Sequence, residues 1–82
     1  MVQGKIKRVN VEQLDSRDQV WCRLRSDAGV TRSYYIYLDV GTTAALAQLQ
    51  LLRDALKNDL RTRLYYQTTG SSRRLYDVQV FS

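Results

Sequence analysis

The sequence contains no histidine, and Cys22 is its only cysteine. Without histidine the chain lacks the side chain most often used for acid–base catalysis near neutral pH. A single cysteine excludes an internal disulfide and any metal site built from several cysteines. Its serines, lysines and carboxylates also show no recognisable nucleophile spacing. We therefore expect a protein that is not an enzyme and that binds no metal or cofactor.

Long apolar runs are also missing. None approaches the roughly 18 residues that a membrane span requires, and residues 1–11 lack the apolar segment of a secretory signal. We expect a soluble chain that is cytoplasmic, or secreted if a signal peptide has been removed. Its 82 residues predict a single domain over 1–82. A domain of this size buries only about 60% of its unfolded surface, so partner subunits would help its stability.

The charge is +5, and ten of the thirteen basic residues are arginine. Arginine suits planar, two-pronged contact with phosphate or carboxylate, which favours an anionic partner. A net charge of this size is also useful for solubility alone. Charge by itself leaves both interpretations open.

Alternation of apolar and polar residues predicts strands at 4–14, 19–26, 33–39, 60–67 and 75–81. Polar segments rich in turn-forming residues separate them, at 15–18, 26–32 and 68–74.

The period of two assigns side chains to the faces of these strands. In the second strand the expected core residues are Val20, Cys22 and Leu24, and the outward residues are Trp21, Arg23 and Arg25. In the third, Tyr34, Ile36 and Leu38 should face the core, and Tyr35, Tyr37 and Asp39 should face outward. In the last, Tyr76 should share the core face with Val78 and Val80.

Residues 44–59 predict an amphipathic helix, with Thr42 or Thr43 as its N-cap. The expected core stripe is Ala45, Leu49, Leu52 and Leu56. A second stripe suggests an oligomer interface, formed by Ala44, Ala47, Leu51 and Ala55. The alternative is that these alanines are simply good helix formers on a half-exposed face.

Three strands, a helix and two more strands match a five-stranded OB-fold, a Greek-key barrel with the order β-β-β-α-β-β. OB-folds bind oligonucleotides or oligosaccharides, and the fold alone does not choose between them.

The chain also resembles the pentameric B subunits of bacterial AB-type toxins, the Shiga-like ones most closely and the pertussis-like ones more loosely. The resemblance spans nearly the whole sequence and rests on "QGKIKRV", the acidic turn in "LDSRDQVWCRL", the aromatic third strand, the Ala/Leu helix and "LRTRLYYQTTGSSRRLYDVQVF". It implies a secreted, lectin-like homopentamer that binds a glycan receptor and is able to partner an A subunit. In such pentamers the helices gather around a central pore.

The glycan site that we expect combines the acidic turn, two outward tyrosines and the hydroxyl-rich loop. Carboxylates and hydroxyls exchange hydrogen bonds with sugars, and tyrosine rings stack on them. The candidate residues are Asp15, Arg17, Asp18, Tyr35, Tyr37, Thr68, Thr69, Gly70, Ser71 and Arg73. Turn formation by the aspartates and interface packing by the tyrosines are the alternatives.

A second function is open as well. An outward face that mixes aromatic and basic side chains is typical of OB-folds that bind single-stranded nucleic acid. The residues for this alternative are Trp21, Arg23, Arg25, Arg61, Arg63 and Tyr65. A purely structural oligomer is the third possibility.

Overall fold

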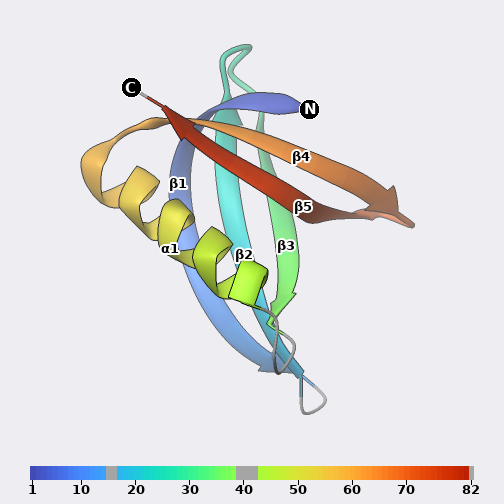
Figure 1. Ribbon diagram of the computed structural model, residues 1–82. Helices are drawn as coiled ribbons and strands as arrows, with labels where there is room; N and C mark the ends of the chain where they lie inside the picture. Colours follow the sequence, from blue (N-terminus) through green and yellow to red (C-terminus); the bar gives the residue numbers. More distant parts are fainter. Residues whose placement is uncertain (15–16, 39–42, 82) are drawn as a thin grey trace.

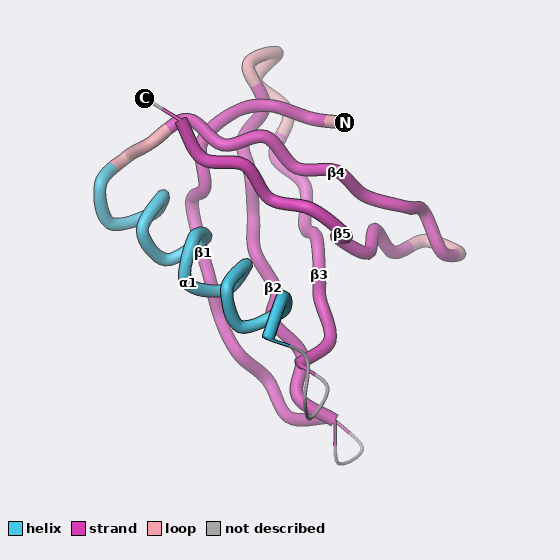
Figure 2. The backbone as a smooth tube through the Cα atoms, in the orientation of Figure 1, coloured by secondary structure: helices cyan, strands magenta, loops and turns pink. Residues whose placement is uncertain are grey.

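The structure is a computed structural model that describes residues 1–14, 17–38 and 43–81. In chain order its elements are β1 (Val2–Leu14), β2 (Arg17–Ser26), β3 (Thr31–Leu38), α1 (Thr43–Asn58), β4 (Arg61–Thr69) and β5 (Ser72–Phe81) (Figure 1). Figure 2 shows how strands dominate the fold. The prediction of a mainly β chain with one helix is confirmed.

The five strands form one closed sheet in the order β1-β2-β3-β5-β4. β1 pairs antiparallel with both β2 and β4, and β4 pairs antiparallel with β5. β3 and β5 run parallel and meet at one residue pair, Tyr35 and Arg74. A parallel pair needs a long crossover connection, and α1 and β4 supply it here.

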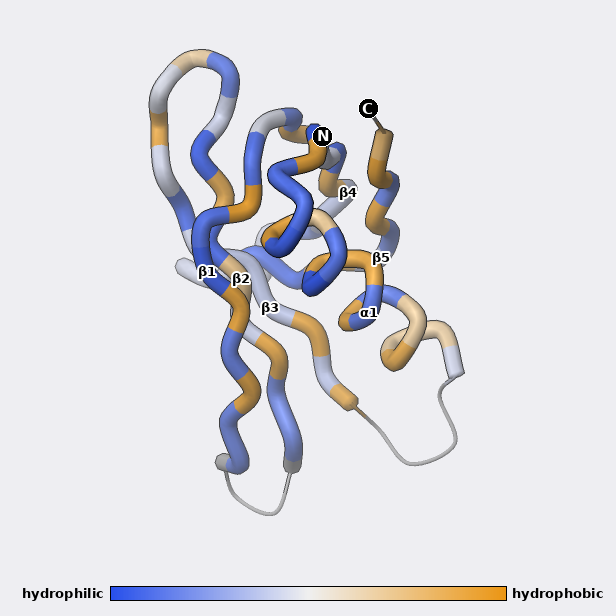
Figure 3. The backbone as a smooth tube through the Cα atoms, turned by 90° about the vertical axis from the view of Figure 1, so that its left-hand side faces the viewer, coloured by the Kyte–Doolittle hydropathy of each residue, from blue (hydrophilic) through white to orange (hydrophobic). Residues whose placement is uncertain are grey.

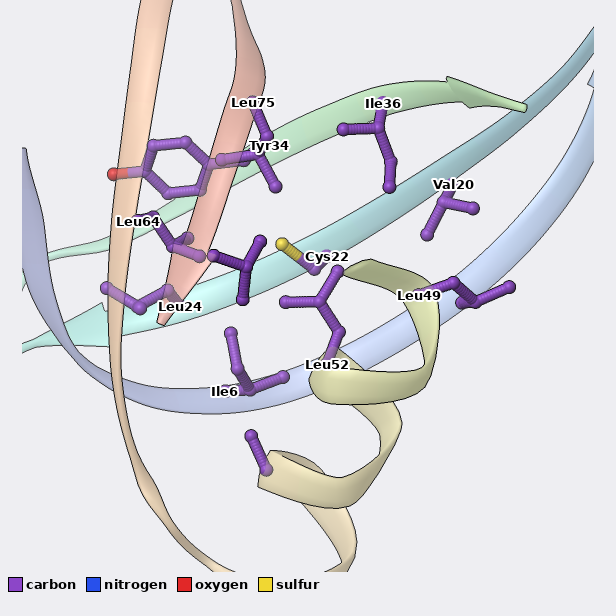
Figure 4. Packing of buried hydrophobic residues seen from close by; sticks show 12 residues of the cluster. Ile6, Val20, Cys22, Leu24, Tyr34, Ile36, Leu49, Leu52, Leu64 and Leu75 are labelled. Atoms are coloured by element: carbon purple, nitrogen blue, oxygen red, sulfur yellow. The ribbon is translucent and has the colours of Figure 1, made fainter. Parts of the chain in front are cut away.

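The core fills the inside of the closed sheet. Hydrophilic and hydrophobic residues alternate along the β1–β2 hairpin, so that one face of each strand points inward (Figure 3). Helix α1 packs against β1, β5 and β3. Its Leu52 is fully buried and lies close to Cys22 and Ile6 (Figure 4). Burial of one such leucine stabilises the fold by about 1.5–3 kcal/mol.

The end of α1 is tied to β1. Asp59 follows the helix with a positive φ of 52°, and the Leu60 amide donates to the Ala55 carbonyl at 3.0 Å. Lys5 Nζ donates to the Asp59 carbonyl at 2.6 Å and lies 3.1 Å from its carboxylate. A lysine is favourable at this end because the helix dipole is negative there.

One position of the predicted core stripe is wrong. Leu56 is 40% exposed, whereas Ala55 is fully buried in the core. Ala55 therefore has no surface to offer the predicted oligomer interface. The other members of that stripe, Ala44, Ala47 and Leu51, are exposed. As for the N-cap, Thr43 is the first helical residue, and Thr42 lies outside the described residues.

The prediction that Tyr76 faces the core is also wrong, because β5 contains a bulge. Tyr65 pairs with Asp77 and Tyr66 pairs with Leu75, so Tyr76 is the extra residue. A bulge reverses the alternation of side chains along a strand. As a result Leu75 is buried and Tyr76 is 59% exposed.

The buried thiol of Cys22 gives a simple test of the core. Burial raises its pKa from 9.0 to about 12, and only the thiolate reacts readily. We expect Cys22 to react with a disulfide reagent at pH 8 far more slowly in the native protein than in denaturant. Because the folded pKa is raised, this group should also weaken the fold as pH rises from about 9 to about 12. Equal reaction rates in both states would contradict this placement of β2.

Candidate functional site

Basic side chains gather on the outer face of β1, β2 and β4. Arg8 lies directly opposite Arg23 in the β1–β2 pairing, and Lys5 lies opposite both Arg25 and Arg61. The buried neighbours Ile6 and Leu24 point the other way, into the core. We call the following six residues the basic strip: Lys5, Arg8, Arg23, Arg25, Arg61 and Arg63.

Only part of the basic strip is neutralised. Lys5 pairs with Asp59, and Arg61 Nη2 lies 2.7 Å from Asp27 Oδ2. Arg63 donates to the Gln3 side chain at 3.0 and 3.3 Å and lies 5.2 Å from the centre of the Phe81 ring.

The other three arginines of the strip are Arg8, Arg23 and Arg25. Within the described part of the chain none of them has a carboxylate at ion-pair distance. Like charges directly opposite one another destabilise a sheet. The strip therefore carries positive charge that the fold does not need for its own stability.

An aromatic row lies on the same outer face, along β2 and β3. We use this name for Trp21, Tyr35 and Tyr37. The Trp21 and Tyr35 ring centres are 5.2 Å apart, and those of Tyr35 and Tyr37 are 5.3 Å apart. Trp21 is half-buried, and its indole N–H donates to Gln19 Oε1 at 3.2 Å. Trp21 thus keeps part of its surface open to a ligand.

Tyr35 faces outward as predicted but is only 6% exposed. The rings of Trp21 and Tyr37 flank it on either side. Tyr35 therefore holds its neighbours in place and offers no ring face to a sugar or a base.

Two hollows adjoin the aromatic row. The outer hollow, about 200 Å³, lies between β1, β2 and β3, and its lining includes Trp21, Arg8, Arg23, Ser33 and one carboxylate, that of Glu12. It brings one aromatic ring beside two arginines that, within the described part of the chain, have no carboxylate at ion-pair distance, and the Glu12 carboxylate accepts instead from Asn10 Nδ2 at 3.2 Å. This combination suits a ligand that carries both a flat ring and an anionic group.

The helix hollow, about 270 Å³, lies between α1, β3, β4 and β5. Ile36 and Leu75 form its apolar part, and Gln48, Gln67 and Arg74 supply polar groups. Two further contacts shape it. The Arg74 guanidinium carbon lies 5.0 Å from the centre of the Tyr37 ring, and Gln48 Nε2 donates to the Tyr76 carbonyl at 3.1 Å.

The predicted glycan groove is not assembled as expected. In Figure 1 the β4–β5 hairpin, which carries Thr68, Thr69, Gly70 and Ser71, projects away from the end of the β1–β2 hairpin. Asp18 is exposed near that end, opposite Leu38. The hydroxyl loop and this acidic residue therefore occupy separate parts of the molecule.

The remaining members of the predicted glycan set are also dispersed. Asp15 lies outside the described residues, and Arg17 opens β2 opposite Leu14. Arg73 lies over the ring of the buried Tyr34, at 5.9 Å from its centre. Burial is also the main cause that raises the pKa of Tyr34 above its ordinary value. It is Arg74 rather than Arg73 that meets the outward Tyr37.

All six residues of the nucleic-acid alternative are found on outward positions of the sheet. Trp21, Arg23 and Arg25 share the outer face of β2, and Arg61, Arg63 and Tyr65 share that of β4. Sequence reasoning missed Lys5 and Arg8, which complete the strip. The basic residues of β1 are evident in the sequence, but the face of the sheet on which Arg8 lies depends on the bulge between Ile6 and Arg8.

The described residues contain no group of three or more histidine, cysteine or acidic side chains able to hold a metal ion. In the same part of the chain, no helix combines the length and apolarity needed to cross a bilayer. In comparisons with known proteins, no family profile, curated protein or solved structure matches the chain significantly.

Proposed function

We propose that the chain is an OB-fold module that binds single-stranded nucleic acid on the outer face of β1, β2 and β3. The strand order, with a parallel β3–β5 contact and a helix between β3 and β4, supports the OB-fold assignment. In OB-folds the face formed by the second and third strands is a common site for oligonucleotides. Here that face carries the aromatic row with Arg23 and Arg25 of the basic strip, and Arg8 adjoins it from β1.

The observation that carries this proposal is the unneutralised trio Arg8, Arg23 and Arg25 beside Trp21. Phosphates of a single strand would bind the arginines and release counterions, and a base would stack on the exposed part of Trp21. Binding would also relieve the repulsion between Arg8 and Arg23, which lie directly opposite one another. One ligand thus accounts for both the ring and the charge pattern.

The test is a titration of a fluorescent oligo-dT of about 15 nucleotides, a length near the site size of one OB-fold. Anisotropy should rise at about 50 mM salt, and affinity should fall steeply toward about 200 mM. Quenching of Trp21 fluorescence should accompany binding. An affinity that does not change with salt concentration, or no binding at about 50 mM salt, would overturn the proposal.

A second candidate is an oligomeric, lectin-like subunit similar to the toxin B pentamers. Exposed hydroxyl groups on the β4–β5 hairpin favour it, because Thr68, Thr69 and Ser71 are open to solvent. Several copies acting together would be needed, since avidity raises apparent affinity by about 10²- to 10⁴-fold. A glycan array tests it: signal that is lost when all three hydroxyl residues are changed to alanine would support this candidate.

Assembly itself can be tested through α1, where Ala44, Ala47 and Leu51 lie exposed on one flank. If this flank packs against another copy, Leu51→Asp should convert the oligomer to monomer, because an unpaired buried charge costs several kcal/mol. Leu46→Asp, on a different side of the helix and 59% exposed, is the matched control. Light scattering that shows a wild-type monomer at micromolar concentration would contradict assembly.

A further inference from the structure

We propose that the helix hollow receives one base of the bound strand, which makes it a base-binding subsite; this inference rests on the proposed nucleic-acid function. The hollow lies at the end of the aromatic row, because Tyr37 belongs to the row and also lines the hollow. Trp21, at the other end of the row, lines the outer hollow. The row thus connects the basic strip to the helix hollow.

The size of the hollow fits a small ligand. Its volume of about 270 Å³ lies just below the range of about 300–1,000 Å³ for pockets that hold drug-sized molecules. One base with its sugar is a suitable occupant. The exposed Ala44 and the Tyr37 ring would contact the base, and the side chains of Ile36 and Leu75, each only 3% exposed, form the floor of the hollow.

The polar groups of the hollow match the edge of a base. The Gln48 side chain donates one of its two N–H groups to the Tyr76 carbonyl. Its second N–H group and its oxygen can therefore bond to a ligand. Gln67 is exposed and adds a second amide. Side-chain amides offer a donor beside an acceptor, which is the pattern that single-stranded bases present on their edges.

Arg74 gives the hollow a preference for anionic ligands. Its guanidinium lies over the Tyr37 ring at 5.0 Å, and its side chain is exposed. A phosphate next to the inserted base would meet this arginine, just as its neighbours along the strand would meet Arg23 and Arg8. Arginines at both ends of the aromatic row, with Arg74 at the helix hollow and Arg8 and Arg23 at the outer hollow, therefore favour a nucleotide over a neutral sugar here.

The test compares oligo-dT with a strand of the same length that lacks all bases. Gln67→Leu should lower affinity for oligo-dT by about threefold to tenfold, the usual effect of losing one hydrogen bond. The same substitution should leave the affinity for the abasic strand unchanged from that of the wild-type protein. Gln79→Leu is the matched control, since Gln79 is an exposed glutamine on β5 outside the hollow. Both residues are exposed, so both variants should fold.

A second measurement locates the base directly. An oligonucleotide that carries 4-thiothymidine should cross-link to Tyr37 as well as to Trp21, as mapped by mass spectrometry. Cross-links at Trp21 alone, with equal affinities for Gln67→Leu and Gln79→Leu, would overturn the subsite and leave the proposed function standing. If neither oligo-dT nor the abasic strand binds, both the subsite and the proposed function are overturned.

Discussion

Changing Arg23 and Arg25 together to glutamine is expected to reduce affinity for oligo-dT about 25-fold at 0.1 M salt. Each phosphate contact to a single strand contributes about 0.7 to the slope of log K against log salt. Two lost contacts should therefore reduce the slope by about 1.4. Over the tenfold range from 1 M to 0.1 M salt this is about 1.4 log units of affinity, which is the loss of about 25-fold. Anisotropy titrations at several salt concentrations measure both quantities.

The fold should tolerate this change. Arg23 and Arg25 are exposed, and each lies opposite another basic residue, so their loss removes repulsion rather than an attractive contact. We expect the thermal midpoint to stay the same or rise. Arg53→Gln combined with Lys57→Gln removes the same charge from the exposed side of α1 and is the control. An equal loss of affinity in this control would mean that net charge alone, rather than the basic strip, attracts the strand.

The second large effect is expected on folding, from Gly4→Ala. Gly4 pairs with Ser26 of β2 and with Thr62 of β4, where β1 closes the sheet. A Cβ atom there would overlap the backbone carbonyl of Arg25, which is not free to move aside. Overpacking a tight site costs about 1–3 kcal/mol and occasionally more. We expect Gly4→Ala to reach the upper end or beyond, a large part of a small domain's stability.

Urea unfolding measures this effect, with Gly29→Ala as the comparison. Gly29 lies in the β2–β3 turn with nothing within 4 Å of the added Cβ, and its φ is +85°. An L-residue in that conformation costs about 1–2 kcal/mol. If Gly4→Ala were no more destabilising than Gly29→Ala, the close approach of β1 and β2 would be wrong.

Much of the fold follows from local patterns in the sequence. The period of two places Cys22 inside and Trp21 outside β2, and the leucine spacing of α1 identifies Leu49 and Leu52 as buried. The exchange between Ala55 and Leu56 could not be predicted in this way. Helical periodicity gives the direction of a side chain, whereas burial near the end of a helix depends on how far the sheet extends beneath it.

The site was less predictable because bulges and strand closure are tertiary features. Strict alternation from Lys5 would place Arg8 on the inner face, but the β1–β2 register shifts between Ile6 and Arg8. That shift brings Arg8 opposite Arg23 and creates the unneutralised pair. The meeting of Arg74 with Tyr37 likewise depends on the parallel contact between β3 and β5, which no local pattern encodes.

The most direct test of the central claim is a chemical-shift map of the ¹⁵N-labelled protein with unlabelled oligo-dT added at low salt. The account predicts that the largest shifts fall on the amides of Trp21, Arg23 and Ser33 and on the Trp21 indole N–H. Amides on the exposed side of α1, such as that of Arg53, should not move. Shifts confined to α1 or to the β4–β5 turn, or a spectrum unchanged by excess oligonucleotide, would contradict the claim that the outer face of β1, β2 and β3 binds single-stranded nucleic acid.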